Sequence, residues 1–215
     1  GVFIGASGKD YSRFLQNCGV IYNPFTSTGN ETSVIAGRLS YIFDLKGPAL
    51  IIDTACSSSL CAATIALETD TVGALIGGAS LILTNDMHLS LGGAGMLSQS
   101  GRCRTFDQEA DGYGRGEAVE VMYASSEVMS ASAISLTGGA MNQDGRSSSL
   151  TAPNGKCQQN VINRAIIRSS REDILREVIL HAHGTGTALG DPIEMNAALA
   201  VYTGSVAAQA LKSWW

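Results

Sequence analysis

Short apolar runs alternate along the 215-residue chain with longer stretches in which apolar residues recur at the three- and four-residue spacing of a helix. The apolar runs predict strands at residues 1–5, 48–52, 72–78, 118–123, 134–136 and 178–180, most of them buried. The helical spacing predicts helices over 57–68 and 156–168 and a third helix that opens at 30–33. This alternation predicts a layered α/β fold with a mixed sheet.

Two segments carry weaker or different signals. Residues 10–17 suit a brief helix or a loop, whereas the polar stretch 20–30, with Pro24 and Gly29, is typical of a loop. A last helix is predicted to begin near Asp191, which suits the N-cap, with Pro192 at the first helical position. The chain shows no internal repeat and no linker that would divide it into independent domains.

Composition narrows the range of functions. The chain is 45% hydrophobic and only 15% charged, which fits a compact protein rather than a disordered one. Its net charge is −5 and it has no cluster of Lys and Arg, so neither a nucleic-acid face nor a polybasic membrane patch is expected. No apolar run approaches the roughly 20 residues that span a bilayer. The expected partners are small molecules or other proteins.

The cysteines and histidines do not form a metal-binding pattern. The five cysteines include no Cys-x-x-Cys pair, and the three histidines are not near them at ligand spacing, so no metal site is expected. The odd number of cysteines and the absence of a signal peptide predict a reducing, cytoplasmic location.

One cysteine lies where the pattern changes from strand to helix. The apolar run 48–52 stops abruptly before Cys56, which stands among small residues and directly precedes the predicted helix 57–68. A helix N-terminus stabilises a thiolate, which would make Cys56 a nucleophile with room for an acyl group beside it. The alternative is an inert core cysteine, because most lone cysteines are buried residues without a chemical role.

A histidine follows the last predicted strand in a similar way. His183 comes shortly after residues 178–180 and is followed at once by glycine and threonine, so its ring has little crowding around it. A neutral imidazole in that place can donate a hydrogen bond to a developing oxyanion or relay a proton. The alternative is a loop histidine that is held by a backbone carbonyl.

Two motifs resemble signatures of one family. Residues 53–60, Asp-Thr-Ala-Cys-Ser-Ser-Ser-Leu, resemble the active-site signature of the β-ketoacyl synthase domain of type I polyketide synthases, within the thiolase superfamily. Residues 183–194, His-Gly-Thr-Gly-Thr-Ala-Leu-Gly-Asp-Pro-Ile-Glu, are similar to the second ketosynthase signature. Further matches at 33–40, 106–107, 111–117, 142–145 and 150–155 occur in the family's order and extend the resemblance to about residue 204.

The resemblance implies a fold, a reaction and a set of site residues. The implied fold is the thiolase-like layered αβαβα fold, of which this chain would hold the first half and the start of the second. Cys56 and His183 would be catalytic, while Thr185 and Thr187 would line the tunnel for a phosphopantetheine arm. The reaction would be a decarboxylative Claisen condensation: an acyl chain forms a thioester on Cys56, and the enolate of a malonyl-type extender attacks it.

The implied partners follow from that chemistry. Substrates would arrive on the phosphopantetheine of an acyl carrier protein domain, with no cofactor bound directly by this chain. Acyltransferase and other polyketide synthase domains would be further partners. The family also implies a homodimer.

The resemblance stops before a second catalytic histidine. The family has a Lys-x-Asn-Ile-Gly-His motif shortly after the segment that corresponds to residues 204–206, but residues 207–215 do not match it and no histidine follows His183. The expected division is therefore a partial ketosynthase domain at 1–204 and a non-matching tail at 205–215. Such a fragment is expected to be poorly soluble or unstable and to lack condensing activity. The connections at 68–71 and 122–132 also look shorter than the family pattern.

Two other interpretations stay open at this point. One is a ketosynthase-like partner or decayed copy without turnover, which the missing histidine favours, although a decayed copy has no reason to keep both Cys56 and His183. The other is a hydrolase with a Cys-His pair, for which no orienting acid or amide is identified.

Four further residues receive secondary interpretations. His181 stands where the family usually has an acidic residue and is interpreted as a neutral substitution, and His88 is interpreted as a surface or loop residue. Asp111 and Glu117 are either a carboxylate pair or part of a glycine-rich loop that supports the site.

Overall fold

A computed structural model describes residues 1–20, 23–127, 134–169 and 177–211 of the chain. The chain divides into two compact units. The first unit comprises residues 1–86 and 116–136, and the second comprises residues 87–115 and 137–215. The chain thus leaves the first unit after residue 86 and returns to it at residue 116 for one more strand.

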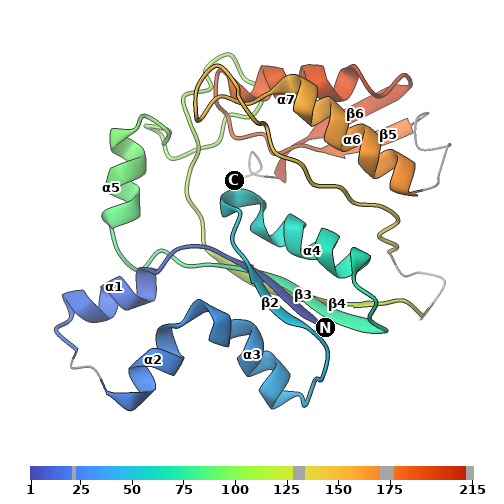
Figure 1. The fold of residues 1–215 in the computed structure, drawn as a ribbon. Coiled ribbons are helices and arrows are strands. Elements are labelled where there is room, and N and C mark those ends of the chain that lie inside the picture. Colours follow the sequence, from blue (N-terminus) through green and yellow to red (C-terminus); the bar gives the residue numbers. More distant parts are fainter. Residues whose placement is uncertain (21–22, 128–133, 170–176, 212–215) are drawn as a thin grey trace. The chain divides into compact units, whose positions relative to one another are not determined.

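The first unit contains a four-stranded mixed sheet (Figure 1). Its strands are β1 (Val2–Ala6), β2 (Ala49–Ile52), β3 (Gly73–Ser80) and β4 (Ala118–Ser125), in the spatial order β2-β1-β3-β4. β1 runs parallel to both β2 and β3, whereas β4 pairs with β3 in the antiparallel direction. These four strands confirm the predicted strands at 1–5, 48–52, 72–78 and 118–123.

Helices cover both faces of this sheet (Figure 1). The first unit holds α1 (Asp10–Asn17), α2 (Pro24–Asn30), α3 (Thr32–Ile42) and α4 (Ser58–Glu68). On one face, Phe3, Ile52 and Ile76 pack with Ala62 and Ala66 of α4. On the other face, Val2 and Ile4 pack with Ala36 of α3. Because successive residues of β1 point to opposite faces, one short strand supplies both core clusters.

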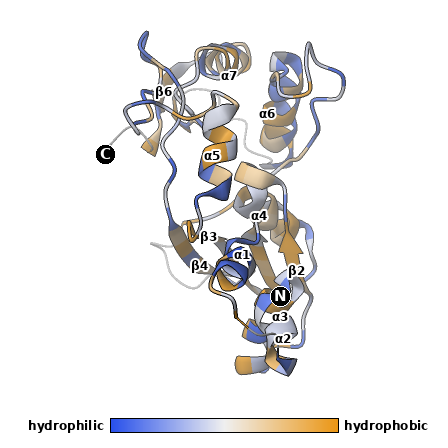
Figure 2. Ribbon diagram, turned by 90° about the vertical axis from the view of Figure 1, so that its left-hand side faces the viewer, coloured by the Kyte–Doolittle hydropathy of each residue, from blue (hydrophilic) through white to orange (hydrophobic). Residues whose placement is uncertain are grey.

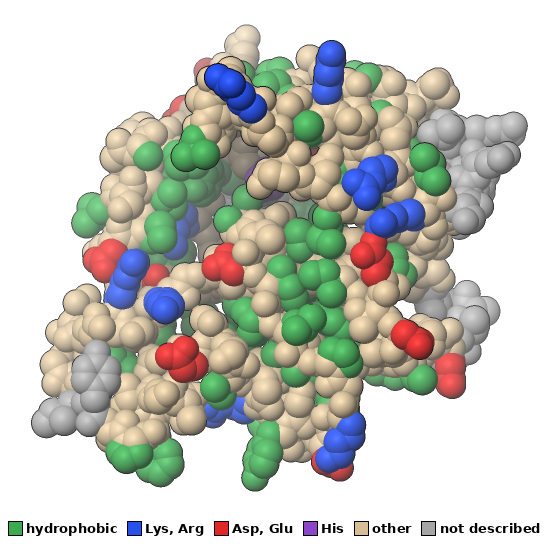
Figure 3. Space-filling view, in the orientation of Figure 1, with side chains coloured by type: hydrophobic (Ala, Val, Ile, Leu, Met, Phe, Trp, Pro, Cys, Tyr) green, Lys and Arg blue, Asp and Glu red, His purple; other side chains and the backbone are tan. Residues whose placement is uncertain are grey.

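The exposed surface of this unit includes large apolar side chains. Figure 2 shows that the strands of the sheet are coloured mainly as hydrophobic, and β4 exposes Val119, Met122 and Tyr123 by 60% or more. Figure 3 shows hydrophobic side chains over the region in which Figure 1 draws α4. Within α4, Leu60 is 70% exposed. The predicted buried helix is therefore buried along one face only.

The second unit combines helices with a pair of strands. It contains most of α5 (Asp86–Gly93), together with α6 (Gly155–Ser169), β5 (Glu177–His181), α7 (Gly190–Leu199) and β6 (Ser205–Gln209). β5 and β6 pair in parallel, and α6 packs against α7. The strand predicted at 178–180 and the helix predicted at 156–168 are confirmed. Residues 205–209, which belong to the expected tail, form β6 and pair with the strand that precedes His183.

Residues 24–30 form a helix, which corrects the predicted loop. The side chain of Asn23 accepts a hydrogen bond from the backbone N–H of Phe25 at 2.9 Å, and Thr26 Oγ1 accepts one from the N–H of Asn23 at 2.9 Å. Pro24 occupies the start of the helix, where its missing N–H costs no hydrogen bond. The proline that suggests a loop is in fact part of a helix start.

Two strand predictions also need correction. Residues 134–136 form no strand, and the side chains of Ile134 and Leu136 are exposed. β2 forms where predicted, but only Ile52 is buried, because β2 lies at the edge of the described sheet and Leu50 faces outward. Both differences have one cause: an apolar segment is buried on both faces only in the middle of a sheet, and neither segment lies there.

Candidate active site

Cys56 lies on a short helical turn between β2 and α4. The turn is a single 3-10 segment, Ala55–Ser57, and α4 begins at the next residue, Ser58. The Cys56 side chain is exposed, and all five cysteines are thiols. Cys56 therefore occupies the strand-to-helix junction that the sequence pattern predicts.

Hydrogen bonds from neighbouring side chains hold this turn in place. Ala55 has a positive φ of 55°, a conformation that residues with side chains rarely adopt. Its N–H donates to Asp53 Oδ1 at 3.2 Å, and its carbonyl accepts from Ser58 Oγ at 2.6 Å. Ser58 Oγ also accepts from the N–H of Thr54 at 2.9 Å. These bonds fix the backbone on both sides of Ala55 and so determine the direction in which Cys56 is presented.

Glycines in the sheet let the first turn of α4 come close to it. A Cβ atom at Gly5 of β1 would lie 2.3 Å from the backbone nitrogen of Ser59, and one at Gly78 of β3 would lie 3.0 Å from the Ser59 Cβ. A side chain at Gly5 would require the helix start to move, and one at Gly78 would require Ser59 to shift by a few tenths of an ångström. The two glycines therefore set the position of the helix N-terminus, and with it the position of Cys56.

His183 lies in the loop that connects β5 to α7. Its side chain is exposed, and its backbone N–H donates to Glu194 Oε1 at 2.6 Å. The N–H of Gly184 donates to the other carboxylate oxygen, Glu194 Oε2, at 2.9 Å. Glu194 lies on α7, so the helix holds the loop backbone at His183 through one carboxylate that accepts two charge-assisted hydrogen bonds.

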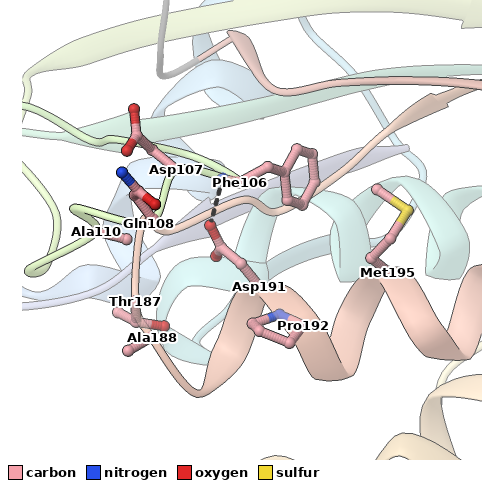
Figure 4. A pocket seen from close by; sticks show the side chains of 9 residues that line it. All are labelled: Phe106, Asp107, Gln108, Ala110, Thr187, Ala188, Asp191, Pro192 and Met195. Atoms are coloured by element: carbon pink, nitrogen blue, oxygen red, sulfur yellow. Dashed lines mark hydrogen bonds between the residues drawn. The ribbon is translucent and has the colours of Figure 1, made fainter.

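Asp191 joins two loops in the second unit. Its side chain is only 4% exposed and accepts a hydrogen bond from the N–H of Gly186 at 3.1 Å. It accepts another from the N–H of Phe106 at 2.9 Å (Figure 4). A buried carboxylate is tolerated when it is hydrogen-bonded in this way. The prediction that Asp191 is the N-cap is wrong, because α7 begins at Gly190, with Leu189 as its N-cap, and Asp191 lies inside its first turn.

The two predicted tunnel threonines lie side by side. Thr185 Oγ1 and Thr187 Oγ1 are 3.0 Å apart and share a hydrogen bond, and Thr187 Oγ1 accepts from the N–H of Gly190 at 3.1 Å. Since the N–H of Gly190 is a donor at the start of α7, the threonine pair is anchored to the beginning of this helix. Two hydroxyl groups are thereby presented together next to His183 in the sequence.

A pocket opens beside Thr187 within the second unit. It has a volume of about 520 Å³ and is shown in Figure 4. Its lining residues are Phe106, Asp107, Gln108, Ala110, Thr187, Ala188, Asp191, Pro192 and Met195. Phe106 and Met195 form an apolar part of the wall, while Asp107 and Gln108 lie on another side of it (Figure 4). The lining combines apolar surface with a few polar groups, as small-molecule sites do.

Asp111 and Glu117 accept hydrogen bonds from separate parts of the chain. Asp111 Oδ2 accepts from the N–H of Gln99 at 3.1 Å, whereas Glu117 Oε1 accepts from the N–H of Ile82. A hydrogen bond from the Ser98 side chain lowers the pKa of Asp111, and the bond from Gln99 acts in the same direction. Each carboxylate ties a loop within its own unit, which favours the supporting role over a carboxylate pair.

The remaining histidines have other surroundings. His181 is the last residue of β5, and its Nε2 lies 3.1 Å from Gln209 Nε2 of the paired strand β6. His88 is exposed on α5. Within the described residues, no group of three or more His, Cys, Asp and Glu side chains is arranged to hold a metal ion. In the same part of the chain, none of the helices has the length and apolar character needed to span a membrane.

Sequence reasoning located Cys56, His183 and the two threonines but missed the residues that hold them. The residues that hold them include Glu194, which accepts hydrogen bonds from the His183 loop, and Gly5, which admits the start of α4. Neither role is visible in the sequence, because each depends on a contact with a segment that is distant along the chain or across a loop.

These features define a class: a thiolase-like α/β protein with a cysteine at a helix start and a histidine–threonine loop. Family models agree with it. The model of the β-ketoacyl synthase N-terminal domain matches residues 1–125, and that of the C-terminal domain matches residues 133–214. The second match includes most of the segment that was expected to be a non-matching tail.

Known polyketide synthases contain similar sequences. Polyketide synthase GfsB of Streptomyces halstedii is 42% identical over 211 residues, which cover 94% of this chain and 4% of that protein. The spectinabilin polyketide synthase system protein NorC of Streptomyces orinoci is 42% identical over 212 residues, which cover 94% of this chain and 9% of that protein. The chain thus spans a small part of the length of these relatives.

Solved structures show the same fold. The ketosynthase from module 6 of the bacillaene synthase from Bacillus subtilis 168 superimposes with a TM-score of 0.84 at 32% identity, over 99% of this chain and 39% of that one. The oxazolomycin ketosynthase domain OzmH KS7 of Streptomyces albus JA3453 gives a TM-score of 0.83 at 27% identity, also over 99% and 39%. The chain belongs to the β-ketoacyl synthase family.

Proposed function

We propose that this chain takes part in carbon–carbon bond formation by decarboxylative Claisen condensation, in polyketide or fatty acid biosynthesis, with Cys56 as the nucleophile. The observation that carries the proposal is the position of Cys56, on a hydrogen-bonded turn that leads directly into α4. The positive end of a helix dipole stabilises a thiolate, and the thiolate is the reactive form of cysteine.

The first step is transfer of an acyl group to Cys56. The thiolate attacks the carbonyl of an acyl-pantetheine thioester, a tetrahedral oxyanion forms, and the pantetheine thiolate leaves and takes up a proton. The products are an acyl thioester on Cys56 and a free pantetheine thiol. The exposed side chain of Cys56 and its small neighbours, Ala55 and Ser57, leave space for this exchange.

The second step forms the new bond. A malonyl-type thioester loses CO₂, and the electron pair of the broken carbon–carbon bond forms an enolate. The enolate carbon then attacks the acyl carbonyl on Cys56. A β-ketoacyl thioester forms and the Cys56 thiolate leaves. His183 would donate a hydrogen bond to the oxyanion that develops in this sequence, a role for which a positioned imidazole is suited.

The carrier arm is the basis of the partner proposal. Phosphopantetheine offers amide and hydroxyl groups, and Thr185 and Thr187 present two adjacent hydroxyls as donors and acceptors. We propose that an acyl carrier protein domain delivers the substrates and that other polyketide synthase domains, including an acyltransferase, supply them. No cofactor bound directly by this chain is required. A homodimer is the expected assembly.

The histidines that the chain contains determine which steps of the reaction we expect it to carry out. The 215 residues contain His88, His181 and His183, and none of these occupies the position of the family's second catalytic histidine. We propose that the 215-residue polypeptide by itself accepts the acyl group but does not complete the condensation.

The test follows the fate of the acyl group. The purified chain is incubated with a hexanoyl-pantetheine thioester, and both the protein-bound acyl group and the free hexanoic acid are measured over time. The proposal predicts one stable acyl group per chain and no continuing release of acid. Cys56→Ala abolishes loading, whereas Cys61→Ala, in the following helix α4, does not. Continuing release of acid would indicate a hydrolase, and no loading would support a non-catalytic partner.

A further inference from the structure

The peptide groups on both sides of Gly184 are held by side chains from two different segments. The N–H of Gly184 donates to Glu194 Oε2 at 2.9 Å, and its carbonyl accepts from Thr105 Oγ1 at 2.6 Å. Thr105 precedes Gly184 by 79 positions in the chain, yet both belong to the second unit. This short bond between a hydroxyl and a carbonyl is partly buried, where hydrogen bonds compete less with water.

These two bonds fix two consecutive peptide planes. The Gly184 N–H belongs to the plane that joins His183 to Gly184, and the Gly184 carbonyl belongs to the plane that joins Gly184 to Thr185. Gly184 has a φ of 50°. Because glycine adopts positive and negative φ about equally readily, its own backbone does little to fix this conformation. The orientation of the loop at His183 therefore depends on the external hydrogen bonds.

The methyl group of Thr105 also fills the space next to Gly184. A Cβ atom at Gly184 would lie 2.4 Å from Thr105 Cγ2 and 2.6 Å from the Cβ of Ala210, which is 3% exposed. Thr105 thus contacts the glycine with its methyl group and holds the carbonyl with its hydroxyl. Its neighbour Phe106 extends the contact, because the Phe106 N–H donates to Asp191 at the other end of the loop.

We propose that Thr105 is a positioning residue for His183: its hydroxyl fixes the Gly184 carbonyl and so sets the orientation of the imidazole and of Thr185. This inference rests on the proposed function, in which His183 donates to an oxyanion. Thr105 lies outside both signature motifs. It belongs to residues 87–115, the first of the two segments that form the second unit.

The test compares variants that keep or remove the hydroxyl. Thr105→Val keeps the branched shape and removes the donor, Thr105→Ser keeps the donor, and Thr203→Val alters an exposed threonine between α7 and β6 as the matched control. NMR of histidine-labelled chain records the ring signals and pH titration of His183, assigned with His183→Gln. Amide hydrogen exchange records the N–H groups of His183 and Gly184.

The expected result is specific to the hydroxyl. Thr105→Val shifts the ring signals and titration of His183 but not those of His88, and exchange at His183 and Gly184 becomes about three- to tenfold faster, the usual effect of losing one hydrogen bond. Thr105→Ser and Thr203→Val retain wild-type behaviour. If Thr105→Val does not fold, Thr105→Ala takes its place.

Two results would overturn the inference. One is a Thr105→Val spectrum in which the His183 ring and both amides behave as in wild type. The other is a Thr105→Ser variant whose His183 signals change as much as those of Thr105→Val. The acyl-loading test on the wild-type chain is a separate readout, so failure of the proposed function and failure of this positioning role are distinguishable.

Discussion

At the scale of single residues, three carboxylates hold backbone segments near the candidate site residues. Asp53, Asp191 and Glu194 each accept hydrogen bonds from backbone N–H groups beside a candidate site residue or within its loop. A carboxylate accepts several such bonds and has no proton to donate when ionised, so it is well suited to hold a loop in one conformation.

Asp111 provides a pH-dependent example. The hydrogen bond from Ser98 holds its pKa below the ordinary value of 3.8, so ionised Asp111 is favoured in the folded state. Its contribution to stability is therefore fully present above about pH 4 and is lost as the pH falls through the lowered pKa. We expect Ser98→Ala to move the pKa of Asp111 back toward 3.8, as measured by NMR titration of the carboxyl carbon. An unchanged titration curve would show that Ser98 has no such role.

The sequence identified the residues with distinctive chemistry and missed those that position them. Cys56 and His183 were found because a cysteine or histidine at the end of an apolar run stands out, and the family motifs strengthened both interpretations. Thr105 has no such signal: its role is defined by a bond to Gly184, and its own neighbours in the sequence do not indicate it. Asp191 was given a local role as a cap because the distant Phe106 was not visible from the sequence.

At the scale of elements, the start of α4 depends on the sheet below it. Gly5→Ala would place a Cβ 2.3 Å from the backbone nitrogen of Ser59, and backbone cannot rotate away as a side chain does. We expect this variant to lower the free energy of unfolding by about 1–3 kcal/mol, the usual cost of overpacking, and to slow alkylation of Cys56 by iodoacetamide.

The matched control for this prediction is Gly37→Ala. Gly37 lies in α3, and a Cβ at that position would meet nothing within 4 Å. Alanine is the better helix former by about 1 kcal/mol, so this variant is expected to be as stable as wild type or more stable. Equal urea midpoints for Gly5→Ala and wild type would show that the close approach of α4 to β1 is not a constraint.

Predictions of elements failed where a local signal had two meanings. Pro24 marks the start of a helix as readily as a loop, and the Asn23 and Thr26 side chains that decide the matter were not considered together. Apolar residues at 134–136 suggested a strand, but a strand needs a partner with which to pair. By contrast, α4, α6 and β1 were placed almost at their observed bounds, because each combines a clear period with a definite end.

At the scale of the whole molecule, the α/β class was predictable and the division into units was not. Residues 87–115 join the second unit, although residues on both sides of them belong to the first. Because residues 87–115 belong to the second unit, Thr105 and Phe106 can form hydrogen bonds with the His183 loop and with Asp191. Hydrophobic periodicity reports which face of an element is buried but not which unit the element joins.

The exposed apolar residues of the edge strand β4 predict self-association. Val119 is 63% exposed on a strand that pairs only with β3 among the described residues, and such edges tend to associate. We expect the apparent mass from light scattering to rise with protein concentration and Val119→Lys to reduce that rise. Ser27→Lys, on the exposed surface of α2, adds the same charge and should leave it unchanged. A concentration-independent mass for the wild-type chain would contradict the prediction.

The central claim is that the sequence places one reactive thiol, Cys56, at the start of α4 and leaves the other four cysteines without that environment. The most direct test is to load the chain with a hexanoyl-pantetheine thioester, digest it, and locate the acyl adduct by peptide mass spectrometry. We expect the adduct on Cys56, with little on Cys18, which is also exposed. An adduct spread over several cysteines, or concentrated on one other than Cys56, would contradict it.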